Sequence, residues 1–175
     1  MSKSQKGLYN IKIVVIGEHA VGKTSLIKKY MDQIFTEDYK PTIGANIFIK
    51  KMVIDEDEYN ISVWDLAGQE KYEKMRFMYY KGAKGALIVG DLTRKDTFKK
   101  IQGFWAPDFY KHESKNAPVL MIANKSDLEP EISEEDLEET ANNIEATSYI
   151  KTSAKMGTQV NDAFVTLIKH IVKKN

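Results

Sequence analysis

The fold of this chain is decided by Gly17-Glu18-His19-Ala20-Val21-Gly22-Lys23-Thr24-Ser25, a glycine followed by four free positions and then Gly-Lys-Thr. The segment follows an apolar run at 11–16 and leads into a helical pattern at 26–30. Its glycines allow a tight turn whose backbone N–H groups point at phosphate oxygens, and the next helix N-terminus adds partial positive charge. Lys23 would reach the β- and γ-phosphates, and the hydroxyl of Thr24 would bind Mg²⁺. The stretch therefore predicts a strand, a phosphate-binding loop and a helix.

The composition limits the classes of function. A chain of 175 residues suffices for one domain with a sizeable core, and its net charge of +1 gives no reason to expect nucleic acid as a partner. The absence of cysteine excludes disulfides and thiolate chemistry and fits a reducing compartment. Neither a signal peptide nor a transmembrane segment is predicted. We expect a cytoplasmic location, peripheral to a membrane only if a lipidated tail lies beyond Asn175.

Apolar and amphipathic segments alternate along the chain, which predicts an α/β fold with a six-stranded, mostly parallel sheet and helices on both faces. Strands are expected at 9–16, 47–54, 58–65, 85–91, 118–123 and 146–150. Helices are expected at 23–33, 75–80, 96–110, 133–144 and 159–172.

The connections are predicted from their turn residues. The short link 55–57 indicates a hairpin, so that one strand runs antiparallel to the others. Residues 34–45 are expected to form a loop, and Pro107 to kink or end its helix. We expect residues 1–8 to be a flexible lead and residues 9–175 to form a single domain.

A second candidate site lies in Trp64-Asp65-Leu66-Ala67-Gly68-Gln69-Glu70, where Asp65 closes a predicted strand. The carboxylate of Asp65 can hold Mg²⁺ directly or through a water. Gly68 can offer an unhindered N–H to a terminal phosphate, and Gln69 can orient an attacking water. Asp-x-x-Gly alone is more often a turn, but ligands bind at the carboxyl ends of parallel strands, where the phosphate loop also lies.

A third candidate site is Asn124-Lys125-Ser126-Asp127, which follows another buried strand. The carboxylate of Asp127 can accept two hydrogen bonds from guanine, whereas adenine has no donors there, so a buried Asp127 would discriminate strongly against it. Asn124 would connect neighbouring loops, and the stem of Lys125 would cover the base. Thr152-Ser153-Ala154-Lys155 could add a backbone N–H to the guanine oxygen.

These motifs together resemble those of the Ras-superfamily small GTPases, in the order and spacing of that family, from about Tyr9 to Val172. The chain is most similar to the Rab branch, and three segments carry that similarity: Thr42-Ile43-Gly44, the run from Trp64 to Glu70, and Tyr79-Tyr80-Lys81-Gly82-Ala83. The resemblance implies a P-loop NTPase G domain that binds GTP or GDP with Mg²⁺.

The resemblance implies a role for each matching position. Phe35 would stack against the guanine, Tyr39 would lie over the phosphates, and Thr42 would bind Mg²⁺ when the γ-phosphate is present. The full nucleotide-binding set is then Gly17, Glu18, His19, Ala20, Val21, Gly22, Lys23, Thr24, Ser25, Phe35, Tyr39, Thr42, Gly68, Asn124, Lys125, Asp127, Ser153, Ala154 and Lys155. The metal would be held by Thr24, Thr42 and Asp65. Catalysis would use Gln69 and Lys23.

Residues 35–47 and 66–80 would be two switch segments, read by effectors, exchange factors and GTPase-activating proteins. Trp64 and Tyr79 would belong to that surface, although both could instead be core residues. The protein is expected to act as a monomer.

Four positions depart from the family pattern. His19 and Ala20 stand where relatives usually carry small residues, often glycine, and the His19 side chain would either face the γ-phosphate or point to solvent. Ile47 stands where Rab proteins commonly have an aromatic residue, and Leu66 replaces a threonine. These departures affect the expected hydrolysis rate and the effector surface.

The predicted function is a slow GTPase switch. The chain has two arginines, Arg76 and Arg94, and neither lies in the first switch, where an arginine acting in cis would be expected, so we expect slow intrinsic turnover and any acceleration to come from a partner's residue acting in trans. One alternative is a GTP-loaded scaffold with negligible hydrolysis because of His19. Another is an ATP-using P-loop protein, against which Asp127 argues.

Overall fold

The computed structural model describes residues 8–32, 38–42, 44–67, 73–112 and 116–174. Within these residues one sheet has the strand order β2-β3-β4-β1-β5-β6-β7. The strands are β1 (Leu8–Gly17), β2 (Asp38–Thr42), β3 (Ala45–Ile54), β4 (Asp57–Leu66), β5 (Gly85–Asp91), β6 (Val119–Asn124) and β7 (Ser148–Thr152). The helices are α1 (Lys23–Asp32), α2 (Glu73–Tyr80), α3 (Lys95–Lys100), α4 (Ala106–His112), α5 (Glu134–Asn143) and α6 (Val160–Lys174).

The predicted α/β fold class is confirmed. Strand β1 pairs in parallel with β4 and β5, and the parallel pairing continues through β6 to β7. Strand β3 runs against its neighbours, as the hairpin predicted, and connects to β4 through Asp55 and Glu56. Both turn residues have positive φ angles, 49° and 74°, which suit a tight two-residue hairpin.

The sheet has a seventh strand that the sequence did not indicate. Residues 38–42 were expected to lie in a loop, but they form β2, antiparallel to β3 at the edge of the sheet. Pro41 made this segment look irregular. An edge strand tolerates proline because one of its sides has no neighbouring strand that needs the missing N–H.

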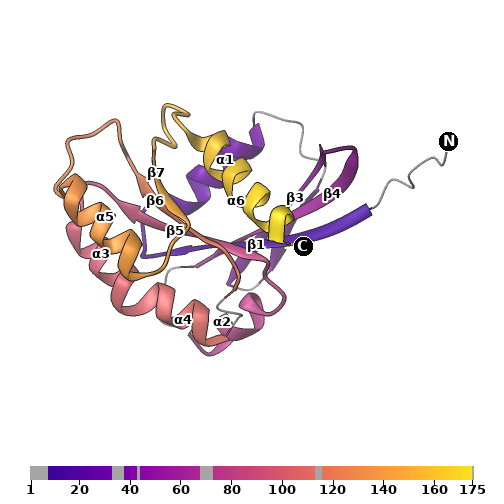
Figure 1. The fold of residues 1–175 in the computed structure, drawn as a ribbon, viewed down its shortest axis with the longest axis horizontal. Helices are drawn as coiled ribbons and strands as arrows, with labels where there is room; N and C mark the ends of the chain where they lie inside the picture. Colours follow the sequence, from indigo (N-terminus) through magenta and orange to yellow (C-terminus); the bar gives the residue numbers. More distant parts are fainter. Residues whose placement is uncertain (1–7, 33–37, 43, 68–72, 113–115, 175) are drawn as a thin grey trace.

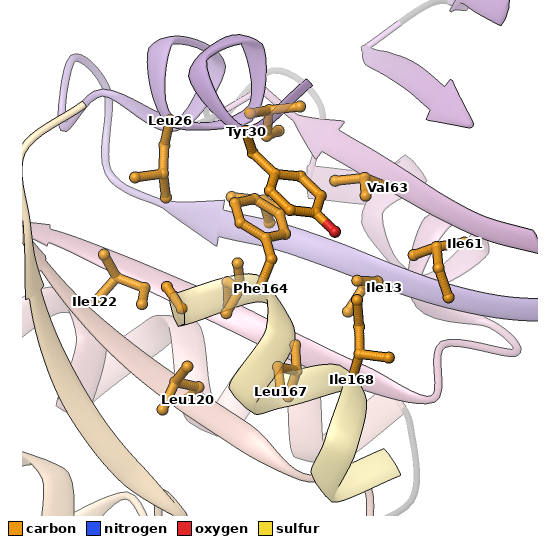
Figure 2. Close-up of a cluster of buried hydrophobic side chains, with 14 of the residues drawn as sticks. Ile13, Leu26, Tyr30, Ile61, Val63, Leu120, Ile122, Phe164, Leu167 and Ile168 are labelled. Carbon is orange, nitrogen blue, oxygen red and sulfur yellow. The ribbon is translucent and has the colours of Figure 1, made fainter. Parts of the chain in front are cut away.

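Helices cover both faces of the sheet, as Figure 1 shows: α1 and α6 lie on one face, and α2 to α5 on the other. Two buried clusters fill these layers. In the first, the ring of Tyr30 on α1 stacks on that of Phe164 on α6 with centroids 4.0 Å apart (Figure 2). Consecutive residues of β1, such as Ile13 and Val14, point into opposite clusters, which explains the continuous apolar run of this strand.

The helix through Pro107 does not end there. It runs from Lys95 to His112 as α3, a π-helical segment at Ile101–Trp105, and α4. The N–H of Ala106 donates to the carbonyl of Ile101, a wider turn than that of an α-helix. Proline lacks an N–H and crowds the preceding turn, and the widened turn just before Pro107 accommodates it.

Other element boundaries differ from the prediction by a few residues. The side chain of Ser133 accepts from the N–H of Asp136 at 3.1 Å, which confirms the predicted N-cap of α5. Strand β7 lies two residues later than expected, because residues 146 and 147 form backbone bonds to Ala141 and Val119 before the strand begins. In the described parts of the chain, no helix is long and apolar enough to cross a bilayer.

Candidate nucleotide-binding site

The predicted site residues meet where the parallel strands of the sheet end. Gly17, Asp65, Asn124 and Thr152 stand at or next to the carboxyl ends of β1, β4, β6 and β7. A cavity of about 580 Å³ opens at these strand ends. It is lined by His19, Ala20, Gly22, Lys23, Thr24, Ser25, Gly44, Ala45, Asn46, Asp65, Leu66, Ala67 and Lys125. The sheet therefore brings the first two predicted motifs and the start of the third together, as the strand-end rule requires.

The cation and metal candidates lie side by side. The hydroxyl of Thr24 donates to Asp65 Oδ2 at 2.5 Å, and Lys23 Nζ donates to the carbonyl oxygens of Gly17 and Glu18 at 3.0 and 2.8 Å. Burial lowers the pKa of Lys23 to about 8, although Asp65 and Glu18 partly oppose this shift. Burial likewise raises the pKa of Asp65, against the hydrogen bond from Thr24.

Both glycines of the motif are required by close contacts. A Cβ at Gly17 would lie 2.3 Å from the carbonyl oxygen of Val89, and one at Gly22 would lie 2.4 Å from the side-chain amide of Asn124. Their φ angles of +145° and +98° are also unfavourable for residues with a side chain. Gly17 thus allows β5 to lie close to the phosphate loop, and Gly22 allows the side chain of Asn124 to lie close to it.

The carbonyl groups of the phosphate loop are all bound by donors from the protein. Beside the two held by Lys23, the carbonyl of His19 accepts from Arg94 Nη1 at 2.9 Å and that of Ala20 from Lys125 Nζ at 3.1 Å. Asn124 Nδ2 donates to the carbonyl of Val21 at 3.0 Å. The N–H of Leu26 donates to the carbonyl of Gly22 at 2.8 Å.

Lys125 is held by a buried acidic residue. Its Nζ lies 2.5 Å from Oδ2 of Asp91, whose side chain is fully buried at the end of β5. Burial alone would raise the pKa of Asp91, but hydrogen bonds from Lys125 and Thr93 bring that pKa below its ordinary value. Asp91 therefore fixes the ammonium group of Lys125 against the loop.

The expected base-recognition residues form one network. Ser153 Oγ donates to Asp127 Oδ1 at 2.6 Å, and this hydrogen bond lowers the pKa of Asp127. Asn124 Oδ1 accepts from Thr152 Oγ1 at 3.0 Å and from the N–H of Ala154 at 3.1 Å. Asp127 is exposed rather than buried, which corrects the premise that its burial would enforce the choice of base.

Several predicted site residues lie outside the described residues or are described only in part. Phe35, Gly68 and Gln69 fall outside them, and for Tyr39 and Thr42 the structure gives only the backbone, in β2. Their roles therefore stay predictions.

The two unusual loop residues lie at the rim of the cavity. His19 is exposed and also lines it, so both interpretations of its side chain remain open. Ala20 has a φ of 61°, the left-handed region that favours glycine, which gives a physical reason for the glycine often found there in relatives. Lys155 is exposed, next to Ala154 in the base-recognition network.

The expected partner surface is less exposed than predicted. Tyr79 is buried, and its ring lies 6.2 Å from that of the half-buried Trp64, so the alternative of a core residue holds for Tyr79. Lys12 Nζ lies 3.8 Å from the centroid of the Trp64 ring. In their place, Phe77 and Met78 are exposed on α2, within the second predicted switch.

The sequence did not assign three residues to the site. Asn46 lines the cavity, Asp91 holds Lys125, and Arg94 binds the loop. Asp91 ends a parallel strand, so the strand-end rule could have indicated it. Nothing in the sequence links Arg94 to a loop 75 positions away.

Comparisons with known proteins agree with this geometry. The Ras family model matches residues 12–173. The chain is 39% identical over 170 residues to Ras-related protein RABA4a of Arabidopsis thaliana, covering 96% of this chain and 74% of that protein. It is 36% identical over 170 residues to Ras-related protein Rab11C of Nicotiana tabacum, covering 96% of this chain and 76% of that protein.

The matched region contains the phosphate loop, the strand ends and the base-recognition network. A model match over nearly the whole chain, with relatives of this identity, shows the family. The chain belongs to the Ras superfamily, in its Rab branch, and is a small GTPase.

Proposed function

We propose that the protein is a Mg²⁺-dependent switch that binds GTP and GDP and hydrolyses GTP slowly. The observation that carries the proposal is the convergence of Lys23, the Thr24–Asp65 pair and the Asn124–Asp127 network around one phosphate loop. Lys23 would neutralise phosphate charge, and Gln69 would orient the attacking water. Residues 9–175 would act as one G domain, in line with the single sheet and the extent of the family match.

The residues at the metal position suit Mg²⁺. Thr24 and Asp65 offer a hydroxyl and a carboxylate oxygen, both hard ligands, beside the cavity. Among the described residues no group of three His, Cys, Asp or Glu could form a cage, which fits an ion that takes one or two protein ligands and completes its shell with phosphates and water. When bound, Mg²⁺ would neutralise charge on the phosphates.

The switch would act through the segments 35–47 and 66–80, which effectors, exchange factors and activating proteins would read. Both segments line the cavity, which supports this proposal, and the N–H of Ala67 donates to the carbonyl of Gly44 at 3.1 Å, which joins the two segments next to the β3–β4 ladder. A γ-phosphate that orders both segments would thereby change one continuous surface. The Rab-named relatives suggest membrane trafficking as the setting.

The alternative of a GTP-loaded scaffold rests on His19. Its side chain is exposed at the rim of the cavity, and in the family position it would approach the γ-phosphate and Gln69. A bulky ring there would exclude or displace the attacking water. The protein would then bind partners in the GTP state without returning to the GDP state by itself.

One experiment tests the proposal: the nucleotide that co-purifies with the protein is identified, and phosphate release from bound GTP is followed in single turnover. Bound GDP or GTP with slow release supports the switch, and GTP without release supports the scaffold. Bound ATP or ADP would overturn both.

The base contact is tested separately with Asp127→Asn. The amide loses one acceptor that guanine requires, so guanine nucleotide affinity should fall by at least about 100-fold. Xanthine nucleotides, which present a carbonyl there, should bind better to the variant than to the wild type. Asp162→Asn, an exposed carboxylate in the first turn of α6, serves as the matched control.

A further inference from the structure

Arg94 belongs to none of the family motifs, yet it contacts the outer side of the phosphate loop. Its Nη1 donates to the carbonyl of His19 at 2.9 Å, and its Nη2 lies 3.6 Å from Oδ2 of Asp96. The side chain is 37% exposed and does not line the cavity. Arg94 therefore contacts the phosphate loop from a side that is not part of the cavity lining.

The backbone of Arg94 is fixed on both sides. Its N–H donates to the carbonyl of Asp91 at 2.9 Å, and its own carbonyl accepts from the N–H and the hydroxyl of Thr97 at 3.0 and 2.7 Å. Thr97 is fully buried. The guanidinium group thus extends from a rigid turn at the start of α3, which makes its direction toward His19 well defined.

The contact at His19 determines the orientation of one N–H group. In a trans peptide the C=O of one residue and the N–H of the next point in opposite directions. Because Arg94 holds the carbonyl of His19 on the outer side, the N–H of Ala20 points toward the cavity that both residues line. This peptide is strained in its observed orientation. Ala20 adopts a left-handed conformation, which costs about 1–2 kcal/mol more for a residue with a side chain than for glycine.

We propose that Arg94 is a positioning residue that holds the peptide between His19 and Ala20 so that its N–H faces the phosphates of the bound nucleotide. The inference rests on the proposed guanine nucleotide site. Arginine suits the task because one terminal nitrogen donates to the carbonyl while the other faces the Asp96 carboxylate as an ion pair, whereas lysine is a single point charge. Lys23, Lys125 and Asn124 hold the neighbouring carbonyls, and Arg94 holds the one between them.

The test compares Arg94→Ala, Arg94→Lys and the control Lys95→Ala. Lys95 is the next residue and also a cation, but it pairs with Asp136 at 2.6 Å, away from the loop. Three quantities are measured: the release rate of fluorescent GDP, the ³¹P NMR shifts of bound GDP, and the melting temperature with saturating GDP.

We expect Arg94→Ala to release GDP about tenfold faster, as the loss of one charged hydrogen bond predicts, and to shift the phosphate resonances. Arg94→Lys should restore part of both effects, while Lys95→Ala should match the wild type. The melting temperature with saturating GDP should fall by no more than roughly 3–5 °C, which is the loss that a tenfold weaker affinity for GDP predicts.

Two results would overturn the inference: wild-type release and phosphate resonances in Arg94→Ala, or equal effects in Lys95→Ala. A large loss of melting temperature that Arg94→Lys does not restore would also overturn it, because the role would then be structural. If the wild type binds no guanine nucleotide, the proposed function itself fails, which is a different outcome.

Discussion

Lys50 on β3 is a buried residue whose charge lowers the stability of the folded state. Its side chain is 5% exposed, and its Nζ lies 3.7 Å from the centroid of the Tyr30 ring. Burial lowers the pKa of Lys50 from 10.5 to about 8 and raises that of Tyr30 to about 12. The folded state therefore holds the lysine proton less tightly than the unfolded chain, although the aromatic ring supplies some compensation.

We predict that Lys50→Met stabilises the protein at pH 7 and that this advantage shrinks as the pH rises from 8 to 10. Below pH 8 both states of the wild type carry the charge, and the folded state bears the full cost of burying it. Between pH 8 and 10 the folded state has lost the proton that the unfolded chain keeps, so wild-type stability rises. Urea unfolding of both proteins at several pH values measures the difference between their free energies of unfolding. The pKa of Lys23 is lowered in both proteins, so its contribution cancels in that difference. A difference that does not change with pH would contradict the prediction.

His19 is the residue at which the intrinsic reaction can be tested. We predict that His19→Gly raises the single-turnover rate of GTP hydrolysis by about tenfold, because removal of the ring from the cavity rim makes room for the attacking water. Phosphate release from pre-bound GTP measures the rate. An unchanged rate would show that the side chain points to solvent.

At the scale of elements, α2 is joined to α4 by a buried ion pair. Nε of Arg76, 3% exposed, lies 3.0 Å from Oδ2 of Asp108, and Tyr80 donates its hydroxyl to the same oxygen at 3.0 Å. The guanidinium carbon also lies 4.9 Å from the centroid of the Phe104 ring and 5.4 Å from that of Trp105. The second switch segment therefore ends in a helix fixed by charge and by aromatic packing.

We predict that Asp108→Ala destabilises the protein by about 3 kcal/mol, because it leaves the Arg76 charge buried without a partner. The double variant Arg76→Met/Asp108→Ala should recover most of that loss. Lys95→Ala, which breaks the exposed pair with Asp136, should cost less than about 1 kcal/mol. Chemical denaturation of the wild type, these three variants and Arg76→Met alone gives the free energies of unfolding, and additive costs at 76 and 108 would contradict the argument.

Most elements could be predicted from the sequence because they bury periodic apolar residues. The strands β1, β5 and β6 are apolar on both faces, and the α6 pattern marks its buried side without ambiguity. Strand β2 could not be predicted, because an edge strand with Pro41 has the composition of a loop and gains its hydrogen bonds from β3. The continuity of the helix through Pro107 also depends on a tertiary environment that no local pattern reveals.

At the scale of the whole molecule, the bound nucleotide would stabilise the fold, since the cavity joins the phosphate loop after β1, the start of β3, the end of β4 and Lys125 after β6. We predict that, after nucleotide removal, each tenfold increase of GDP above its dissociation constant adds about 1.4 kcal/mol of stability, or roughly 3–5 °C in melting temperature. ADP should give no shift, and chelation of Mg²⁺ should reduce the effect of GDP. Differential scanning fluorimetry is sufficient, and equal shifts with ADP would contradict guanine selectivity.

The site could be predicted from the sequence where its residues directly follow the ends of parallel strands. Lys23, Thr24 and Asp65 meet as expected, because β1, which leads into the phosphate loop, and β4, which carries Asp65, are adjacent and parallel. Arg94 was not predictable, because its role comes from a contact with the backbone of the phosphate loop, whereas the strand-end rule could have indicated Asp91, which ends β5 beside Lys125. The exposure of Asp127 could not be predicted either, since it depends on how the loop after β6 leaves the sheet.

The π-helical segment between α3 and α4 has a consequence for changes in chain length. A π turn contains one residue more than an α turn, so Ile101–Trp105 holds a residue that a regular helix would not need. Gly103 lies there with open space around it, and its removal, together with Pro107→Ala, would close the turn while α4 keeps its orientation. The same deletion within α6 would rotate its buried residues out of the core by about 100°. A single-residue deletion should therefore be tolerated at this point of the molecule, next to the helix that anchors the second switch.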